Sequence, residues 1–149
     1  MSAASRPVPA DFAHRIALAV RWGDMDALGH VNNVKFFTYD EQVRLQYFDA
    51  IAAVVPDFWK SSGIILAKLG CDFVGQLRYP ATLDIGFRIS RLGRSSFDTE
   101  AAMFERGRLV AVTRGTLVWF DYQQQKSLPI PEQVRTLIRE REARAPVEA

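Results

Sequence analysis

The chain has 149 residues, of which 48% are hydrophobic and 24% are charged, with a formal net charge of +2. These values are typical of one globular domain and exclude a disordered, collagen-like or coiled-coil chain. No stretch approaches the roughly 18 apolar residues that a membrane helix needs, and the small net charge does not indicate nucleic-acid binding. A single cysteine, Cys71, excludes an intrachain disulfide and a thiolate metal site. Residues 1–7 lack the apolar core of a secretory signal, so we expect a cytoplasmic protein.

We expect one domain over residues 1–149, beginning with a loose tail at 1–10. Alternating apolar residues predict a first strand over 14–20. Two glycines and two aspartates then predict a loop over 22–30. Apolar and aromatic residues at helical spacing, on more than one face, predict a long and largely buried helix from 34 to about 51.

The second half of the chain is dominated by strand patterns that short turns separate. Four further strands are predicted, at residues 64–79, 82–92, 97–105 and 109–121. Two prolines then introduce a polar C-terminal helix at about 132–144. Strands that follow one another in sequence favour an antiparallel sheet, so the order of elements predicts an α+β fold. In this fold, about five strands pack against one long helix.

Polar side chains concentrate in the loop that precedes the long helix. Asp24, Asp26, His30, Asn32 and Asn33 follow one another within ten residues. Either asparagine is a suitable helix N-cap, and the free N–H groups at a helix start can stabilise an oxyanion. A nearby aspartate can act as a nucleophile or as a general base toward water. This combination predicts an acyl-transfer or hydrolysis site, while the alternative interpretation is a structural polar turn.

The run D-M-D-A-L-G-H-V-N-N at 24–33, followed by Phe36, Tyr39, Glu41 and Arg44, resembles the 4-hydroxybenzoyl-CoA/acyl-CoA thioesterase family. It is closest to the bacterial long-chain acyl-CoA thioesterase branch. Further runs at 92–97 and 126–131 also resemble the family, and the likeness covers about residues 14–140. The resemblance implies the hot-dog fold, an acyl-CoA substrate, no metal and no bound cofactor. It also implies homodimers that join sheets edge to edge and often pair into tetramers, with active sites between subunits.

The resemblance also implies roles for individual residues. Asp26 falls at the catalytic carboxylate, and Asn33 at the position whose backbone N–H polarises the thioester carbonyl. Glu41 falls at a helix carboxylate that helps to position water or the acyl group; its alternative role is an ion pair with Arg44, three residues further on. The family often has tyrosine where this chain has Phe36, so one hydroxyl is missing here. Aromatic residues of the long helix, which are Phe36, Phe37 and Tyr39, are candidates to contact the acyl chain.

Two further groups are candidate substrate-binding residues. His30 can act as a general acid or can simply stabilise the loop. Arg94, Ser95 and Ser96 form a predicted turn with three donor side chains, which suits the phosphates or the pantetheine of coenzyme A. The alternative for this turn is a solvated hairpin.

The sequence therefore predicts an acyl-CoA thioesterase, and three alternatives stay open. One is the same fold acting on acyl carrier protein. Another is a hot-dog module that binds acyl-CoA without catalysis. The third is a metal-dependent hydrolase that uses Asp24, Asp26 and His30 as ligands, although their spacing matches no standard metal site.

Overall fold

A computed structural model describes residues 5–148, so the first four residues of the expected tail lie outside it. Five long strands form one antiparallel sheet in the order β1-β3-β4-β5-β2. These strands are β1 (His14–Ala19), β2 (Ser62–Phe73), β3 (Thr82–Leu92), β4 (Ser96–Glu105) and β5 (Arg108–Asp121). Two short strands that were not predicted extend it: β6 (Lys126–Ser127) pairs with β5, and β7 (Val147–Glu148) pairs in parallel with β3.

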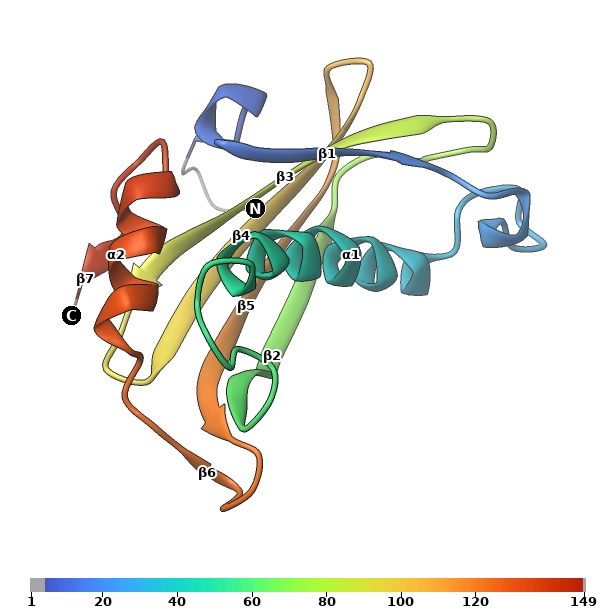
Figure 1. Cartoon of the computed structure of the whole chain (residues 1–149). Coiled ribbons are helices and arrows are strands. Elements are labelled where there is room, and N and C mark those ends of the chain that lie inside the picture. Colours follow the sequence, from blue (N-terminus) through green and yellow to red (C-terminus); the bar gives the residue numbers. More distant parts are fainter. Residues whose placement is uncertain (1–4, 149) are drawn as a thin grey trace.

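The long helix α1 (Asn33–Ala52) lies across one face of the curled sheet, as Figure 1 shows. It buries aromatic and aliphatic side chains on several faces, as its sequence predicts. Its residue Phe48 is fully buried and packs edge-on against Phe97 of β4. The helix begins where Asn32 Oδ1 accepts a hydrogen bond of 3.0 Å from the Val34 N–H, so Asn32 is the N-cap. The architecture confirms the predicted α+β hot-dog fold.

The strand predicted at residues 64–79 ends earlier than expected. In the structure β2 stops at Phe73, and residues 74–81 leave the sheet. The reason is a contact that lies outside the local pattern: the Leu77 carbonyl accepts a hydrogen bond of 2.8 Å from the Val31 N–H. This segment therefore packs against the loop before α1 instead of continuing the strand.

The C-terminal helix α2 (Glu132–Arg141) covers the end of the sheet remote from that loop (Figure 1). Val134 and Ile138 anchor it in the main core. It ends three residues before the predicted boundary because Glu142 adopts an extended backbone. The Glu142 side chain then turns inward, where one oxygen, Oε1, accepts hydrogen bonds from the Tyr47 hydroxyl (2.6 Å) and the Ile89 N–H (3.0 Å).

We expect Glu142 to make stability depend on pH. Burial raises the pKa of its carboxyl group, although the Tyr47 and Ile89 hydrogen bonds oppose the shift. A raised folded-state pKa adds stability below the unfolded-state pKa, and this contribution is lost as pH rises through the folded-state pKa. Glu142→Gln keeps the accepting oxygen but cannot ionise, so it should flatten the profile. Urea unfolding between pH 4 and pH 8 measures this, with exposed Glu140→Gln as control; equal slopes for parent and Glu142→Gln would contradict it.

Candidate active site

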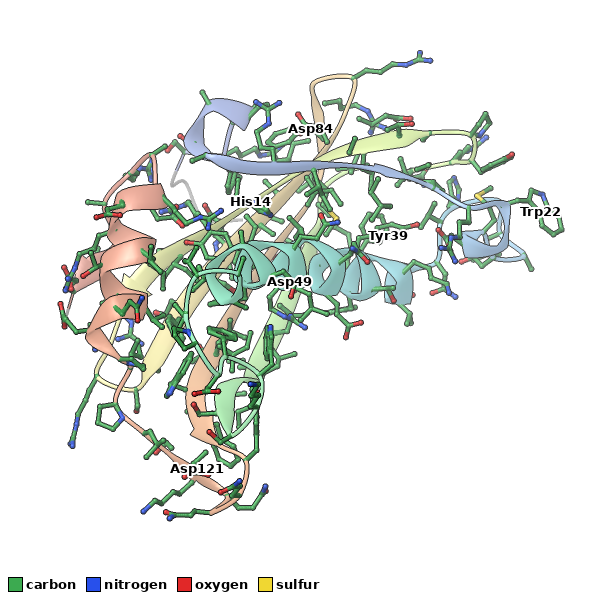
Figure 2. The ribbon with its side chains drawn as sticks, viewed as in Figure 1. His14, Trp22, Tyr39, Asp49, Asp84 and Asp121 are labelled. Atoms are coloured by element: carbon green, nitrogen blue, oxygen red, sulfur yellow. The ribbon has the colours of Figure 1, made fainter. Side chains whose placement is uncertain are left out.

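The loop between β1 and α1 closes into a tight turn. Asp26 N–H donates to the His30 carbonyl (2.9 Å), and Gly29 N–H donates to the Asp26 carbonyl (3.1 Å). Gly29 has a φ of +84°, a conformation that favours glycine. Figure 2 places Trp22 at the outer end of this loop and Tyr39 on the adjoining part of α1.

The first aspartate of the loop, Asp24, is occupied by structural contacts. Its carboxylate is buried and accepts hydrogen bonds from the Tyr39 hydroxyl (2.6 Å) and the Arg21 N–H (3.0 Å). Burial alone would raise the pKa of Asp24, but these hydrogen bonds and the nearby Lys35 ammonium lower it below its ordinary value. Asp24 is therefore an ionised anchor that ties the loop to α1.

The second aspartate, Asp26, keeps part of its carboxylate open. It is half-buried, and Oδ1 accepts a hydrogen bond of 2.9 Å from the Leu28 N–H. Within residues 5–148, no donor lies within hydrogen-bonding distance of Oδ2. The residue pattern alone does not separate Asp24 from Asp26. In the structure both hydrogen bonds to Asp24 end on Oδ2, its Oδ1 lies 4.0 Å from Lys35 Nζ, and Asp26 is the more exposed of the two residues.

The start of α1 supplies backbone donors next to this loop. The Asn32 side-chain oxygen accepts a hydrogen bond from the Val34 N–H, and its backbone carbonyl accepts one from the Lys35 N–H (2.9 Å). Asn33 is the first helical residue, and its N–H has no acceptor among residues 5–148. Free N–H groups at a helix start carry partial positive charge. The loop and the helix start therefore present a half-buried carboxylate, Asp26, and a free backbone N–H, that of Asn33, which are groups of the kinds that can act as a base and as an oxyanion donor.

His30 has a partner that the sequence does not predict. Its Nε2 lies 3.1 Å from Arg78 Nη2. A guanidinium only donates hydrogen bonds, so Nε2 of His30 is the acceptor in this contact. No local signal in the sequence identifies Arg78, because the contact depends on how residues 74–81 fold back onto the loop.

Glu41 does not pair with Arg44, so the ion-pair interpretation is wrong. Glu41 is exposed on α1, and Arg44 Nη1 instead contacts Asp40 Oδ2 at 2.7 Å. Asp40 Oδ1 also accepts a hydrogen bond of 2.5 Å from the Thr113 hydroxyl of β5. Burial raises the pKa of Asp40, while Thr113 and Arg44 oppose the shift. This buried cluster joins α1 to the sheet.

The turn that carries Arg94, Ser95 and Ser96 lies at the other end of the sheet. The chain enters β3 at Thr82, which pairs with the end of β1, and reaches this turn only after Leu92. Eleven extended residues separate the two ends by roughly 30 Å. In the turn, the Ser96 hydroxyl accepts a hydrogen bond of 3.0 Å from Arg91. Within one subunit these three residues and Asp26 are not brought together.

The candidate metal ligands do not converge either. The described residues 5–148 contain no group of three His, Cys, Asp or Glu side chains that could hold a metal ion. In the same part of the chain, no helix is both long and apolar enough to span a membrane.

Comparison with known proteins identifies a family and solved structures that this chain resembles. Residues 20–138 match the family model of the Thioesterase-like superfamily. A thioesterase from Thermus thermophilus, solved with coenzyme A and Zn, is 33% identical; the match covers 90% of this chain and 97% of that chain, with a TM-score of 0.78. The PA5185 protein from Pseudomonas aeruginosa is 24% identical, with coverages of 95% and 99% and a TM-score of 0.82, and shows the fold alone.

Two curated relatives match over part of their length. YsmA of Bacillus subtilis, described as uncharacterized, is 33% identical over 79 residues, which are 53% of this chain and 52% of that protein. The chloroplastic acyl-acyl carrier protein thioesterase ATL2 of Arabidopsis thaliana is 26% identical over 126 residues, which are 83% of this chain and 66% of that protein. The chain thus spans about half of the first relative and just under two thirds of the second. Together with the family match, the thioesterase neighbours support thioester hydrolysis as the class of activity.

Proposed function

Because this chain belongs to the Thioesterase-like superfamily, we propose that it hydrolyses a fatty or aromatic acyl-CoA to the free acid and coenzyme A. The observation that carries the proposal is the open Oδ2 of Asp26 on the loop that leads into the α1 N-terminus. The 4-hydroxybenzoyl-CoA/acyl-CoA branch, and its long-chain subgroup in particular, is proposed on the 24–33 motif.

In the proposed reaction, Asp26 accepts a proton from water, and the water oxygen attacks the thioester carbonyl carbon. The negative charge that develops on the carbonyl oxygen is held by backbone N–H groups near Asn33. Collapse of the tetrahedral intermediate breaks the C–S bond and releases the CoA thiolate, which takes up a proton. The second route begins with attack by Asp26 itself, which gives a mixed anhydride and the thiolate; water then hydrolyses the anhydride.

The acyl group is proposed to lie near the α1 aromatics. Phe36 and Tyr39 are buried in the core, so their rings serve mainly as packing, whereas Phe37 is only half-buried and is the better candidate for direct contact. Glu41, exposed on α1, stays a candidate for positioning water or substrate. Apart from water and the substrate, every group that takes part in this scheme belongs to the chain, so the proposal includes no cofactor, and we expect activity to survive EDTA. The expected cytoplasmic location is part of the same proposal.

A thioesterase that acts on acyl carrier protein is the second candidate, favoured by the name of the Arabidopsis relative. The deciding experiment is thiol release, followed with a disulfide reagent, from short, medium, long and aromatic acyl-CoAs and from matched acyl carrier proteins. Turnover of an acyl-CoA supports the proposal, and its profile identifies the acyl class. Turnover of carrier-protein substrates alone favours the second candidate. Tight acyl-CoA binding with no release from either series would instead indicate a binding module.

We also propose a homodimer, or a tetramer built from it, that joins β2 edges. Among the strands of residues 5–148, β2 pairs with β5 alone, and apart from an isolated bridge between Ser62 and Phe58 its outer backbone edge is open. Leu66 and Phe73 on β2 are 44% and 50% exposed, and a second subunit on this edge would cover them. The predicted result is that Leu66→Glu lowers the mass measured by light scattering from dimer toward monomer. Val8→Glu, at an exposed position outside β2, is the control; an unchanged Leu66→Glu mass would exclude this interface.

A further inference from the structure

A charged recess lies on the face of the sheet opposite α1. Phe87 and Ile89 of β3 belong to the main core, so Arg88 between them points to the other face. The recess has a volume of about 470 Å³, and its lining includes Asp11, Arg88, Glu100, Arg114 and Arg144. These residues are distinct from those of the candidate active site.

The floor of the recess is a row of charges that crosses three neighbouring strands. Arg88, Glu100 and Arg114 stand opposite one another in the register of β3, β4 and β5. Glu100 Oε1 accepts a hydrogen bond of 3.1 Å from Arg88 Nε, and Glu100 Oε2 lies 3.1 Å and 3.0 Å from Nε and Nη2 of Arg114. Arg114 Nη1 donates to Asp72 Oδ2 at 3.2 Å. Both oxygens of Glu100 and all three nitrogens of Arg114 are therefore engaged.

The other two guanidiniums of the recess keep N–H groups that no side chain occupies. Arg88 is only 9% exposed, yet its contact with Glu100 uses Nε alone; within residues 5–148 its two Nη atoms have no hydrogen-bond acceptor. Arg144 Nη2 lies 3.6 Å from Asp11 Oδ1, which is longer than a hydrogen bond. Buried donors without acceptors cost stability, so Arg88 in particular favours a ligand that supplies acceptor oxygens.

We propose that this recess binds a phosphate group, either as inorganic phosphate or as a small phosphate monoester. Three guanidiniums face two carboxyl groups, so the recess is positively charged whatever the ionisation of the acids. Arginine donates to phosphate oxygens in pairs. A tetrahedral phosphate has oxygens for Arg88 and Arg144 at the same time, whereas a carboxylate has only two oxygens to share between them.

A phosphate in this position would join segments that are distant in the sequence. Arg88 lies on β3, whereas Arg144 follows α2 and its partner Asp11 precedes β1. Next to Asp11, the Phe12 ring packs on the same outer face, in the space above Gly86. The ligand would therefore hold both ends of the described chain against the sheet and stabilise the folded state. This inference is independent of thioester hydrolysis.

The test is calorimetric titration of the full chain with inorganic phosphate, glycerol phosphate and acetate, at an ionic strength held constant with chloride. We expect saturable binding of phosphate at one site and much weaker binding of acetate. The tighter of the two phosphate compounds shows whether the recess takes the free anion or an ester. Arg144→Gln should raise the Kd about tenfold, because one charge-assisted contact is lost. Arg88→Lys keeps the charge but loses the paired donors, so it should also weaken binding.

Arg94→Gln is the matched control, because it removes the same charge from an exposed position outside the recess. Phosphate stabilises folded proteins in general, so its saturable effect on the melting temperature should be larger for the parent than for Arg144→Gln. Arg144 is exposed, so this variant tests the recess even if Arg88→Lys fails to fold. Absence of saturable phosphate binding, acetate binding as tight as that of phosphate, or a loss in Arg94→Gln equal to that in Arg144→Gln would overturn the proposal.

Discussion

Replacing Asp26 with Asn is expected to lower kcat for the best acyl-CoA by at least about 100-fold, the usual contribution of a general base. The amide cannot accept the proton of the attacking water and cannot act as a nucleophile. Its oxygen can still accept the Leu28 N–H, so the turn should remain intact. Thiol release under saturating substrate measures the change. Melting temperature and circular dichroism, measured on the same preparation, should match the parent.

Asp24→Asn is the matched control, because it makes the same chemical change two residues away. Its carboxylate is used by Tyr39 and Arg21, so we expect a loss of about 1–2 kcal/mol in the free energy of unfolding, from weakened charge-assisted hydrogen bonds. The kcat of the folded fraction should stay within a few-fold of the parent. An Asp26→Asn enzyme with parental kcat, or a reversed pattern between the two variants, would remove Asp26 from the reaction.

Local periodicity was sufficient to predict most of the elements. The strand predicted at residues 82–92 coincides with β3, and the helix predicted from 34 to about 51 is α1 within one residue at each end. Both have strong, uninterrupted spacing of apolar residues. The strand predicted at 64–79 failed in its last third, because the pattern carries no information about the Leu77–Val31 contact that draws this segment toward the loop.

In the candidate site, too, local sequence patterns predict some features, whereas others depend on contacts between residues that are distant in the sequence. The sequence identifies the loop and, through the family motif, favours Asp26 over Asp24, but the physical difference between the two carboxylates depends on Tyr39, fifteen residues away. Arg78 was missed because it is 48 residues from His30. The partner of Arg44 was misassigned by a single residue, and one residue turns a helix by about 100°, which separates a buried side chain from an exposed one.

That misassigned pair leads to the largest stability effect that we expect. Asp40 is 1% exposed, and Arg44 beside it is also buried. Asp40→Ala removes the acceptor of both Arg44 and the Thr113 hydroxyl. The guanidinium is then left buried without its counter-charge, and we expect a loss of about 3–5 kcal/mol in the free energy of unfolding. Urea unfolding measures this loss, with Glu41→Ala as control, because exposed Glu41 should change stability by less than about 0.5 kcal/mol.

A double-mutant cycle shows whether the loss in unfolding free energy comes from the unpaired charge of Arg44 or from lost packing. If the unpaired Arg44 guanidinium dominates, Asp40→Leu combined with Arg44→Leu should be less destabilised than Asp40→Leu alone, since no buried charge remains. If the losses in unfolding free energy for Asp40→Leu and Arg44→Leu, each measured singly, add up to the loss of the double variant, the pair is uncoupled and the contact at 2.7 Å contributes little.

Asp40, Arg44 and Thr113 fix α1 against β5, and the N-terminus of α1 carries the proposed oxyanion donor. Coupling between Asp40 and Arg44 would therefore also mean that Asp40 orients the proposed active site. Asp40→Asn should then lower kcat even at temperatures at which the variant is fully folded. Glu142→Gln should not, because Glu142 contacts α1 at Tyr47, which lies further from the N-terminus of this helix.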